Sequence, residues 1–314
     1  MKPKIIFFGT PDFAVQILEV IYNANMIIDA VVTSPDKKSG RGRKITSSAV
    51  KKFCLVNKIK YHQPDNLKEY TFLSTLKSYN SDIYVVVAFR MIPKLVWSIP
   101  KIATFNLHAS LLPEYRGAAP INWVLINQEK YTGLTTFIID NKIDTGKILL
   151  QSQYKIKKRE IFDSLQKELI KKGKKLVINT IELLLKKNYE AYEQKFFPKL
   201  NSAPKLTKNN TKIDWRKSLR QINALIDGLN SYPGAWSYIS GESKTDTFKI
   251  YEAECEYKSH KFNHNKLLFD RRSIKIAHRE GFLVIKNLKL PNKRRMTSKE
   301  LLNGYVFKSD VFVS

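Results

Sequence analysis

Cysteine is scarce in this chain, and long apolar stretches are lacking. The 314 residues include two cysteines, Cys54 and Cys255, which do not form the CxxC spacing of zinc and redox sites. The sequence therefore argues against a disulfide framework and against a bound metal, and it favours a reducing compartment. No apolar run approaches the roughly 18 residues that a membrane-spanning helix needs, and the apolar N-terminal segment is too short for a signal-peptide core. We expect a cytoplasmic protein without a membrane partner.

Acidic residues are also in short supply. The chain has 28 Asp and Glu against 55 Lys and Arg, which gives a formal net charge of +27. Residues 1–200 carry +16 of this charge and residues 201–314 carry +11, so the excess is not confined to one tail. A bias toward lysine can explain why lysine takes the place of arginine, but it does not explain why basic residues outnumber acidic ones. Such a field attracts polyanions such as nucleic acid or an anionic membrane, and we expect nucleic acid.

The first strand is not followed by a glycine-rich phosphate loop. The turn Gly9-Thr10-Pro11-Asp12 matches neither GxGxxG nor a P-loop, which argues against a dinucleotide-binding domain. Continuous apolar runs alternate with amphipathic helical patterns, and this predicts an α/β domain with a mostly parallel sheet covered on both faces. Ligands bind such sheets at the carboxyl ends of the strands. The predicted strands are residues 5–8, 30–33, 83–89, 104–108 and 133–139.

The rest of the chain predicts a second, smaller domain. Residues 161–187 have the apolar stripe of one or two helices, and residues 190–206 read as a linker without a clear period. After a helix over 213–230, short alternating segments predict a small antiparallel barrel. We therefore expect an N-terminal α/β domain over 1–189, the linker over 190–206 and a C-terminal domain over 207–314.

Three polar residues follow or end predicted strands between positions 106 and 144. Asn106 and His108 are two residues apart, so both face the same side of one strand. An amide and an imidazolium can stabilise developing negative charge, and a carboxylate at Asp144 could orient the histidine or accept a proton. The residues alone leave the alternatives open: a hydrogen-bonded structural histidine, and an Asp-Thr-Gly turn without a chemical role.

The segments HASLLPEYRGAAPINWVL (108–125) and DNKIDTGKIL (140–149) resemble the folate-dependent formyltransferases. The resemblance implies that Asn106, His108 and Asp144 are the catalytic residues and that 10-formyltetrahydrofolate is the co-substrate. Arg90 replaces a glycine that is common in this family, so the 88–93 loop corresponds only loosely. The residues implied to line the folate pocket are Phe89, Met91, Ile92, Ser110, Leu111, Leu112 and Pro113.

Within this family, the chain is most similar to the members that act on methionyl-tRNA. The similarity extends over residues 4–307 and is weakest at 240–285. It implies a Rossmann-like catalytic domain, a linker and a C-terminal barrel of the OB type. It also implies formyl transfer to the α-amino group of initiator methionyl-tRNA in translation initiation. Separately, we expect a monomer and no metal. The segments that carry it are FFGTPDFAV, PDKKSGRGRK, APKLT, IDWRKSLRQINALIDGLNSYPGAW and KRRMTSKELLNGY.

Two basic segments are candidate tRNA-binding surfaces. Residues 37–52 contain seven Lys and Arg and no acid, and the resemblance implies that this inserted loop reaches the acceptor end of the tRNA, with Arg41 as its main contact. A flexible, solvated loop is the alternative. The second segment lies in the predicted barrel, a fold that often binds oligonucleotides. The candidate residues are Lys37, Lys38, Arg41, Arg43 and Lys44 in the first segment and Lys293, Arg294 and Arg295 in the second.

Two other functions remain possible on the sequence. Another folate-dependent formyltransferase, acting on a small amine or a sugar nucleotide, would not need the 37–52 loop or a basic C-terminal domain. A non-catalytic RNA-binding protein would not need Asn106, His108 and Asp144 together. Incubation with 10-formyltetrahydrofolate and methionyl-tRNA distinguishes the three, because each predicts a different product.

Overall fold

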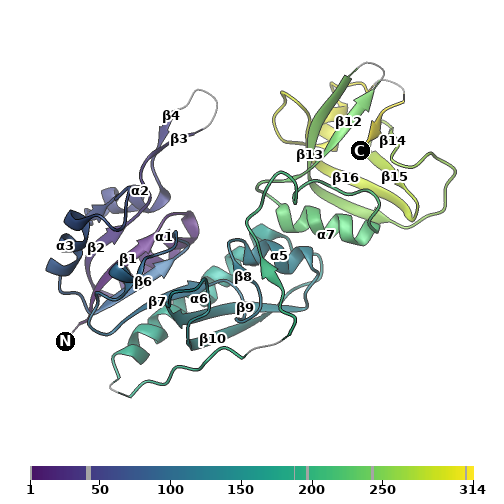
Figure 1. The fold of residues 1–314 in the computed structure, drawn as a ribbon. Coiled ribbons are helices and arrows are strands. Elements are labelled where there is room, and N and C mark those ends of the chain that lie inside the picture. The colour runs from purple at the N-terminus through teal and green to yellow at the C-terminus, as the bar shows by residue number, and fades with distance from the viewer. Residues whose placement is uncertain (1, 40–43, 187, 196–197, 242–243, 308–309) are drawn as a thin grey trace. The chain divides into compact units, whose positions relative to one another are not determined.

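The computed structural model describes residues 2–39, 44–186, 188–195, 198–241, 244–307 and 310–314. The chain folds into two compact units, and each is built from separate stretches of sequence (Figure 1). The first unit comprises Met1–Gly117, Tyr131–Lys155 and Gln166–Ser202, and the second comprises Ala118–Lys130, Ile156–Leu165 and Ala203–Ser314. The expected division at residues 189 and 207 stays a prediction.

A seven-stranded sheet forms the centre of the first unit. From one edge to the other its strands are β10 (Ile148–Lys155), β9 (Tyr131–Ile138), β7 (Ala103–His108), β6 (Ile83–Val87), β1 (Lys4–Gly9), β2 (Ile27–Val32) and β5 (Tyr61–His62). Neighbouring strands from β7 to β5 pair in parallel, whereas β9 pairs antiparallel with both β7 and β10. The predicted α/β fold with a mostly parallel sheet is therefore confirmed. Strand β10 was not predicted from the sequence pattern.

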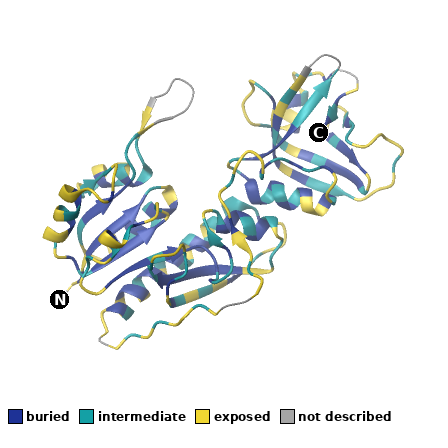
Figure 2. Ribbon diagram, in the orientation of Figure 1, coloured by how far each residue is buried: buried dark blue, intermediate teal, exposed yellow. Residues whose placement is uncertain are grey.

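Helices pack on this sheet because its strands are apolar on both faces. Side chains alternate between the faces along β1, and all of Ile5–Phe8 are fully buried (Figure 2). Ile6 and Phe8 pack in a cluster with Phe72 of α3 (Tyr70–Ser78) and Val96 of α4 (Lys94–Trp97). The other covering helices are α1 (Asp12–Asn23) and α6 (Phe162–Leu184), which are linked by an ion pair between Glu19 and Lys174.

The basic segment after β2 contains two short strands that pair with each other. The strands β3 (Lys37–Ser39) and β4 (Lys44–Thr46) pair antiparallel, where the sequence predicted only a loop. Asp36 precedes the hairpin and forms a 2.6 Å ion pair with Lys51 of α2 (Ala49–Val56). The hydrogen bond from Lys51 lowers the pKa of Asp36. Lys51 is thus engaged within the protein, which makes it less available to a polyanion.

An antiparallel sheet forms the centre of the second unit and confirms the predicted small barrel. In order it contains β14 (Leu267–Phe269), β15 (Ile274–His278), β16 (Gly281–Lys289), β13 (Lys244–Glu256), β12 (Ala235–Gly241) and β18 (Phe312–Val313), and β17 (Met296–Thr297) pairs with β16. A bridge between Lys266 and Phe312 brings the two ends of this order together, so the barrel is nearly closed.

Two helices of the second unit show how local sequence sets their ends. Helix α7 (Leu219–Leu229) begins six residues later than the predicted 213, because Ser218 forms a capping box with Gln221. Ile213 instead donates a backbone hydrogen bond to Trp236 of the barrel. Thr297 and Glu300 form a second capping box at α8 (Ser298–Leu302). Across the described residues, no helix combines the length and the apolar character required to cross a bilayer.

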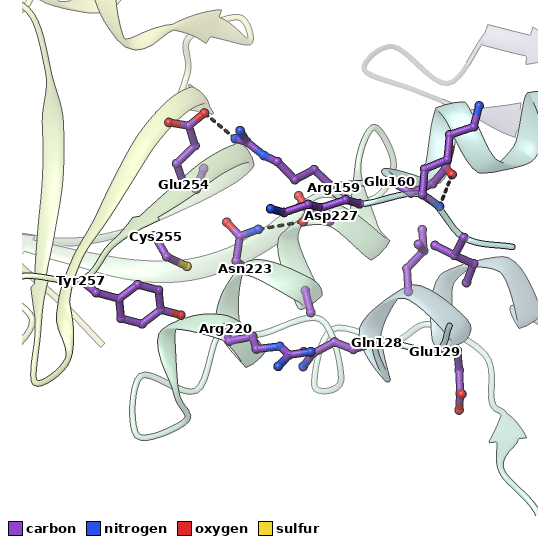
Figure 3. Close-up of a pocket in the computed structure, with 16 residues that line it drawn as sticks. Gln128, Glu129, Arg159, Glu160, Arg220, Asn223, Asp227, Glu254, Cys255 and Tyr257 are labelled. Atoms are coloured by element: carbon purple, nitrogen blue, oxygen red, sulfur yellow. Dashed lines mark hydrogen bonds and ion pairs between the residues drawn. The ribbon is translucent and has the colours of Figure 1, made fainter. Parts of the chain in front are cut away.

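A pocket of about 590 Å³ lies wholly within the second unit (Figure 3). Residues of α7, of β13 and of the segment 156–160 line it. Asn223 Nδ2 donates to Asp227 Oδ2 at 2.7 Å, and Arg159 forms an ion pair with Glu254 (Figure 3). Burial raises the pKa of Asp227 to about 7, although the nearby Arg159 acts in the opposite direction. This carboxyl therefore favours the protonated form compared with an exposed aspartate.

Asp227→Asn is expected to stabilise the second unit more at pH 8 than at pH 5. Below the ordinary pKa of 3.8, Asp227 is protonated in the folded and unfolded states and has no pH-dependent cost. As the pH rises to about 7, the unfolded state ionises first, so the folded state loses stability. Above that value the cost is constant, and each unit of pKa difference corresponds to about 1.4 kcal/mol. Urea unfolding at both pH values measures the difference.

Asp310→Asn is the control, because it removes the same charge at an exposed position of the second unit. We expect a much smaller pH-dependent change in the free energy of unfolding for this variant. Equal stability differences at pH 5 and pH 8 for Asp227→Asn would contradict the proposed cost of burial.

Candidate active site at the end of β7

The strand β7 carries two of the three predicted catalytic residues. β7 lies between β6 and β9, where Asn106 pairs with Phe137 and His108 pairs with Thr135. The Asn106 side chain is partly exposed, and none of the described residues hydrogen-bonds to its amide. His108 is 7% exposed and ends the strand. The amide is thus free to donate to a ligand at the carboxyl end of the sheet.

The hydrogen bonds of His108 define which ring nitrogen faces the site. Nε2 lies 2.9 Å from the backbone oxygen of Tyr115. Because a carbonyl oxygen can only accept, Nε2 must carry the proton and donate it there. In the neutral imidazole the lone pair therefore resides on Nδ1, which lies 3.7 Å from Asp144 Oδ2. Nδ1 is therefore the nitrogen that faces Asp144 and has a lone pair free to accept a proton.

The loop after β9 presents Asp144 to His108. Asp144 has a positive φ of 54°, and its Oδ2 accepts a 2.9 Å hydrogen bond from the backbone N–H of Gly117. A Cβ at Gly146 would lie 1.7 Å from the backbone oxygen of Ile138, so only glycine permits this close return of the chain. The structure therefore brings Asp144 and His108 together from segments 36 positions apart in the sequence.

The segment between His108 and Tyr115 is fixed by hydrogen bonds, and those of Thr135 are buried. Ser110 is fully buried, and its hydroxyl donates to the backbone oxygen of Glu114 at 2.6 Å. Thr135 of β9 donates its hydroxyl to Ser110 O at 2.7 Å and accepts from Leu112 N at 3.0 Å. Gln151 of β10 donates to Leu112 O at 2.9 Å. Of the predicted folate-pocket residues here, Ser110 and Leu112 are buried, whereas Leu111 and Pro113 are partly exposed.

The 88–93 loop also follows a central strand, β6. Met91 is 65% exposed and Ile92 only 5%. Phe89 packs edge-on against Phe8, with ring centroids 5.7 Å apart. The Arg90 guanidinium donates to the backbone oxygens of residues 64 and 65, so the arginine found in place of the usual glycine is directed at a neighbouring loop.

The structure describes only some of the predicted tRNA-binding residues of the 37–52 segment. Arg41 and Arg43 lie outside the described residues, and for Lys38 and Lys44 only the strand backbone is described. Lys37 is exposed at the start of β3.

In the barrel, the three predicted basic residues lie in an exposed turn between β16 and β17. The Arg295 guanidinium stacks over the Tyr251 ring at 4.3 Å and donates to Asn287 at 2.9 Å. Arg294 lies 3.8 Å from Glu300, and Lys293 lies over the ring of Tyr305.

The thiols are not placed for nucleophilic chemistry. Burial raises the pKa of Cys54 to about 12 and also raises the pKa of Cys255. Both therefore stay protonated near neutral pH. Among the residues that the structure describes, no group of three or more His, Cys, Asp and Glu is arranged to hold a metal ion.

Sequence reasoning missed several residues that build this site. Gln194, in the predicted linker, hydrogen-bonds to the Asp144 loop. Thr135 and Gln151 fix the 108–115 segment. The linker has no periodicity that singles out Gln194, Thr135 reads as an ordinary position of the predicted strand 133–139, and Gln151 lies in β10, a strand that the sequence pattern did not predict. Arg116, which contacts Gln194, belongs to the 108–125 segment that carries the family resemblance.

Two protein-family models match the chain. The model described as "Formyl transferase" matches residues 3–181, which include all of the candidate catalytic residues. The model described as "Formyl transferase, C-terminal domain" matches residues 205–306.

Curated relatives match along nearly the whole chain. A methionyl-tRNA formyltransferase of Flavobacterium johnsoniae is 46% identical over 312 residues, which are 99% of this chain and 99% of the relative. One of Bacteroides thetaiotaomicron is 39% identical over 307 residues, which are 96% of this chain and 95% of the relative.

Solved structures share the fold at low sequence identity. HypX from Aquifex aeolicus in complex with tetrahydrofolic acid has a TM-score of 0.66 at 17% identity, covering 96% of this chain and 47% of HypX. WlaRD, a sugar 3N-formyl transferase, has a TM-score of 0.63 at 22% identity, covering 94% of this chain and 100% of WlaRD. With both family models and relatives of 39–46% identity along its length, the chain belongs to the formyl transferase family, among its methionyl-tRNA formyltransferases.

Proposed function

We propose that this chain transfers the formyl group of 10-formyltetrahydrofolate to the α-amino group of initiator methionyl-tRNA, as a step of translation initiation. The observation that carries the proposal is the 3.7 Å approach of Asp144 Oδ2 to His108 Nδ1, two residues from the partly exposed side chain of Asn106. Membership of a family whose curated relatives bear this activity in their names supports the same conclusion. We also propose that the chain acts as a cytoplasmic monomer.

The proposed chemistry is attack of the neutral α-amine on the formyl carbon. An α-amino group has a pKa near 7.7–8, so a useful fraction is neutral at physiological pH. A carbon–nitrogen bond forms to the amine, the bond to the folate nitrogen breaks, and the proton lost by the amine balances the one gained by that nitrogen. Negative charge develops on the formyl oxygen, and hydrogen-bond donors held close to it lower the barrier.

Each of the three polar residues has a distinct proposed role. The Asn106 amide donates to the developing oxyanion. His108, protonated on Nδ1, donates to the same oxygen, and its Nε2–H bond to Tyr115 prevents the ring from turning. Asp144 stabilises the imidazolium and accepts the amine proton, directly or through water. These roles require no covalent intermediate with the protein and no metal.

The residues around β6 and β7 fit a folate co-substrate. A pteridine needs an apolar wall with a few polar groups, which is the usual composition of small-molecule sites. Met91, Phe89, Leu111 and Pro113 expose apolar surface, and we propose that they contact the ring. The buried Ser110, Leu112 and Ile92 would shape the pocket from behind, since they have little surface to offer a ligand.

The proposed partner, tRNA, accounts for the net charge of +27. Binding of basic residues to phosphates releases condensed counterions and makes the affinity fall with salt. We propose that the basic 37–52 segment and the turn at 293–295 are two contact sites. The stacked guanidinium of Arg295 and the exposed Arg294 would supply bidentate donors to phosphate oxygens.

One assay tests the proposed function against its rivals. The purified chain is incubated with 10-formyltetrahydrofolate and methionyl-tRNA, and formylmethionine is measured after deacylation. We expect rapid formylation. Formylation of a small amine or an amino sugar nucleotide in its place would favour a related formyltransferase, and tRNA binding without turnover would favour a non-catalytic RNA-binding protein.

The 37–52 segment is expected to contribute both charge and positioning. Replacing Lys37, Lys38 and Lys44 with alanine should weaken tRNA binding and flatten its dependence on log salt by up to about three phosphate contacts. Arg41→Ala should also lower turnover at saturating tRNA, because misplacement by an ångström can cost about 10²-fold. Both variants are assayed for binding and for kcat across a salt series.

A triple variant at Lys68, Lys77 and Lys175 is the control, since it removes the same charge at exposed positions elsewhere in the first unit. It should change the salt dependence far less. Wild-type turnover by Arg41→Ala at saturating tRNA would show that the segment only guides tRNA electrostatically.

A further inference from the structure

Gln194 connects the predicted linker to the Asp144 loop. Its Nε2 donates hydrogen bonds to the backbone oxygens of Asp144 and Gly146, both at 2.9 Å. Its Oε1 accepts from Nε and Nη2 of Arg116, at 3.1 and 2.6 Å. The two carbonyls need a donor and the guanidinium needs an acceptor, so only one orientation of the amide satisfies all four bonds. All of these residues belong to the first unit.

The backbone around Gln194 is itself held against the sheet. Tyr192 and Ile148, the first residue of β10, exchange backbone hydrogen bonds of 2.7 and 2.8 Å. These bonds hold the backbone close to Gln194, which lies two residues after Tyr192. From there its side chain reaches both the loop that carries Asp144 and the strand β8 (Arg116–Gly117), whose Gly117 N–H binds the Asp144 carboxylate.

Asp144 needs such support because its backbone conformation is unfavourable by itself. A positive φ of 54° is uncommon for a residue other than glycine and persists where the surroundings determine it. Gln194 binds the carbonyl group of Asp144 itself and that of Gly146, two residues further along the loop. Release of these two carbonyls would let the loop relax and would alter the 3.7 Å approach to His108.

We propose that Gln194 is a positioning residue for formyl transfer: it holds the Asp144 loop so that the carboxylate faces Nδ1 of His108. Gln194 touches neither substrate in this proposal and acts only through Asp144. Arg116 orients the amide of Gln194 and thereby couples the segment after His108 to the same loop. The inference rests on the proposed function, because it assigns Gln194 a part in that reaction.

Two substitutions test the hydrogen bonds that the Gln194 side chain donates to the Asp144 loop. Gln194→Glu keeps an oxygen for Arg116 but cannot donate to the two carbonyls. Gln194→Leu removes both the donor and the acceptor without adding charge. We expect either variant to lose about 10- to 100-fold in kcat, with the KM for methionyl-tRNA changed less than threefold. Gln153→Glu, the same substitution at an exposed residue of β10, should keep wild-type kcat.

A double-mutant cycle distinguishes positioning from general support of the fold. If Gln194 acts through Asp144, Gln194→Glu should cause no further loss in an Asp144→Ala background. A loss of the same size in both backgrounds, or wild-type kcat in both Gln194 variants, would overturn the proposal. Failure of the wild-type chain to formylate methionyl-tRNA would refute the proposed function instead, so the two failures are distinguishable.

Discussion

His108→Ala is expected to lower kcat for formylation of methionyl-tRNA by about 10²- to 10⁴-fold. The reason lies in the hydrogen bonds of the ring: Nε2 is committed to the backbone oxygen of Tyr115, so Nδ1 alone can carry a proton toward the substrate. Asp144 Oδ2, 3.7 Å away, stabilises that proton. Alanine removes the donor and leaves the carboxylate of Asp144 without its cationic neighbour. Single-turnover formylation at saturating substrates measures the chemical step directly.

His108→Gln controls for loss of the buried hydrogen bond. A glutamine amide can donate to the backbone oxygen of Tyr115, but it cannot become a cation. We expect this variant to retain the stability of the wild type better than alanine does and to be similarly inactive. Binding of tetrahydrofolate and of tRNA should change little in both variants. Near-normal single-turnover rates in either variant would remove His108 from the catalytic residues.

Asn106→Ala is expected to lower kcat by about 10²- to 10³-fold, the usual cost of deleting one donor to an oxyanion. Asn106 has a partly exposed side chain whose amide has no hydrogen-bond partner among the described residues. Its removal therefore leaves no buried polar group unpaired in the protein, and the melting temperature should stay close to that of the wild type. The expected loss belongs to kcat, because the contact strengthens as charge develops on the formyl oxygen.

Asn106→Asp tests the direction of this hydrogen bond. The aspartate has the same shape but cannot donate when ionised, and its charge opposes a developing oxyanion, so the loss should be at least as large as for alanine. Asn179→Ala, at an exposed position of α6, is the matched control and should keep wild-type kcat. If Asn106→Asp retained full activity, a donor role for this residue would be untenable.

Strands, and the face of a strand on which a side chain lies, depend on residues close together in the sequence and could therefore be predicted from it. The segments of β1, β6, β7 and β9 indicated buried strands, because they are short and rich in apolar, aromatic and β-branched residues. The two-residue spacing of Asn106 and His108 placed both on one face of β7. The similarity of the surrounding motifs then indicated the chemistry. The predicted start of α7 at residue 213 is wrong, because the apolar pattern continues upstream of Ser218, the residue that caps the helix.

Contacts between distant segments were decided only by the tertiary structure. No local pattern distinguishes Gln194 from other polar residues of a non-periodic stretch, yet four hydrogen bonds connect it to Arg116 and to the Asp144 loop. The same holds for the burial of Asp227 and for the assignment of residues 118–130 and 156–165 to the second unit. Side-chain periodicity determines which residues face a core, whereas hydrogen bonds between distant loops depend on how the whole chain folds. The orientation of Asp144 toward His108 is one of these long-range features.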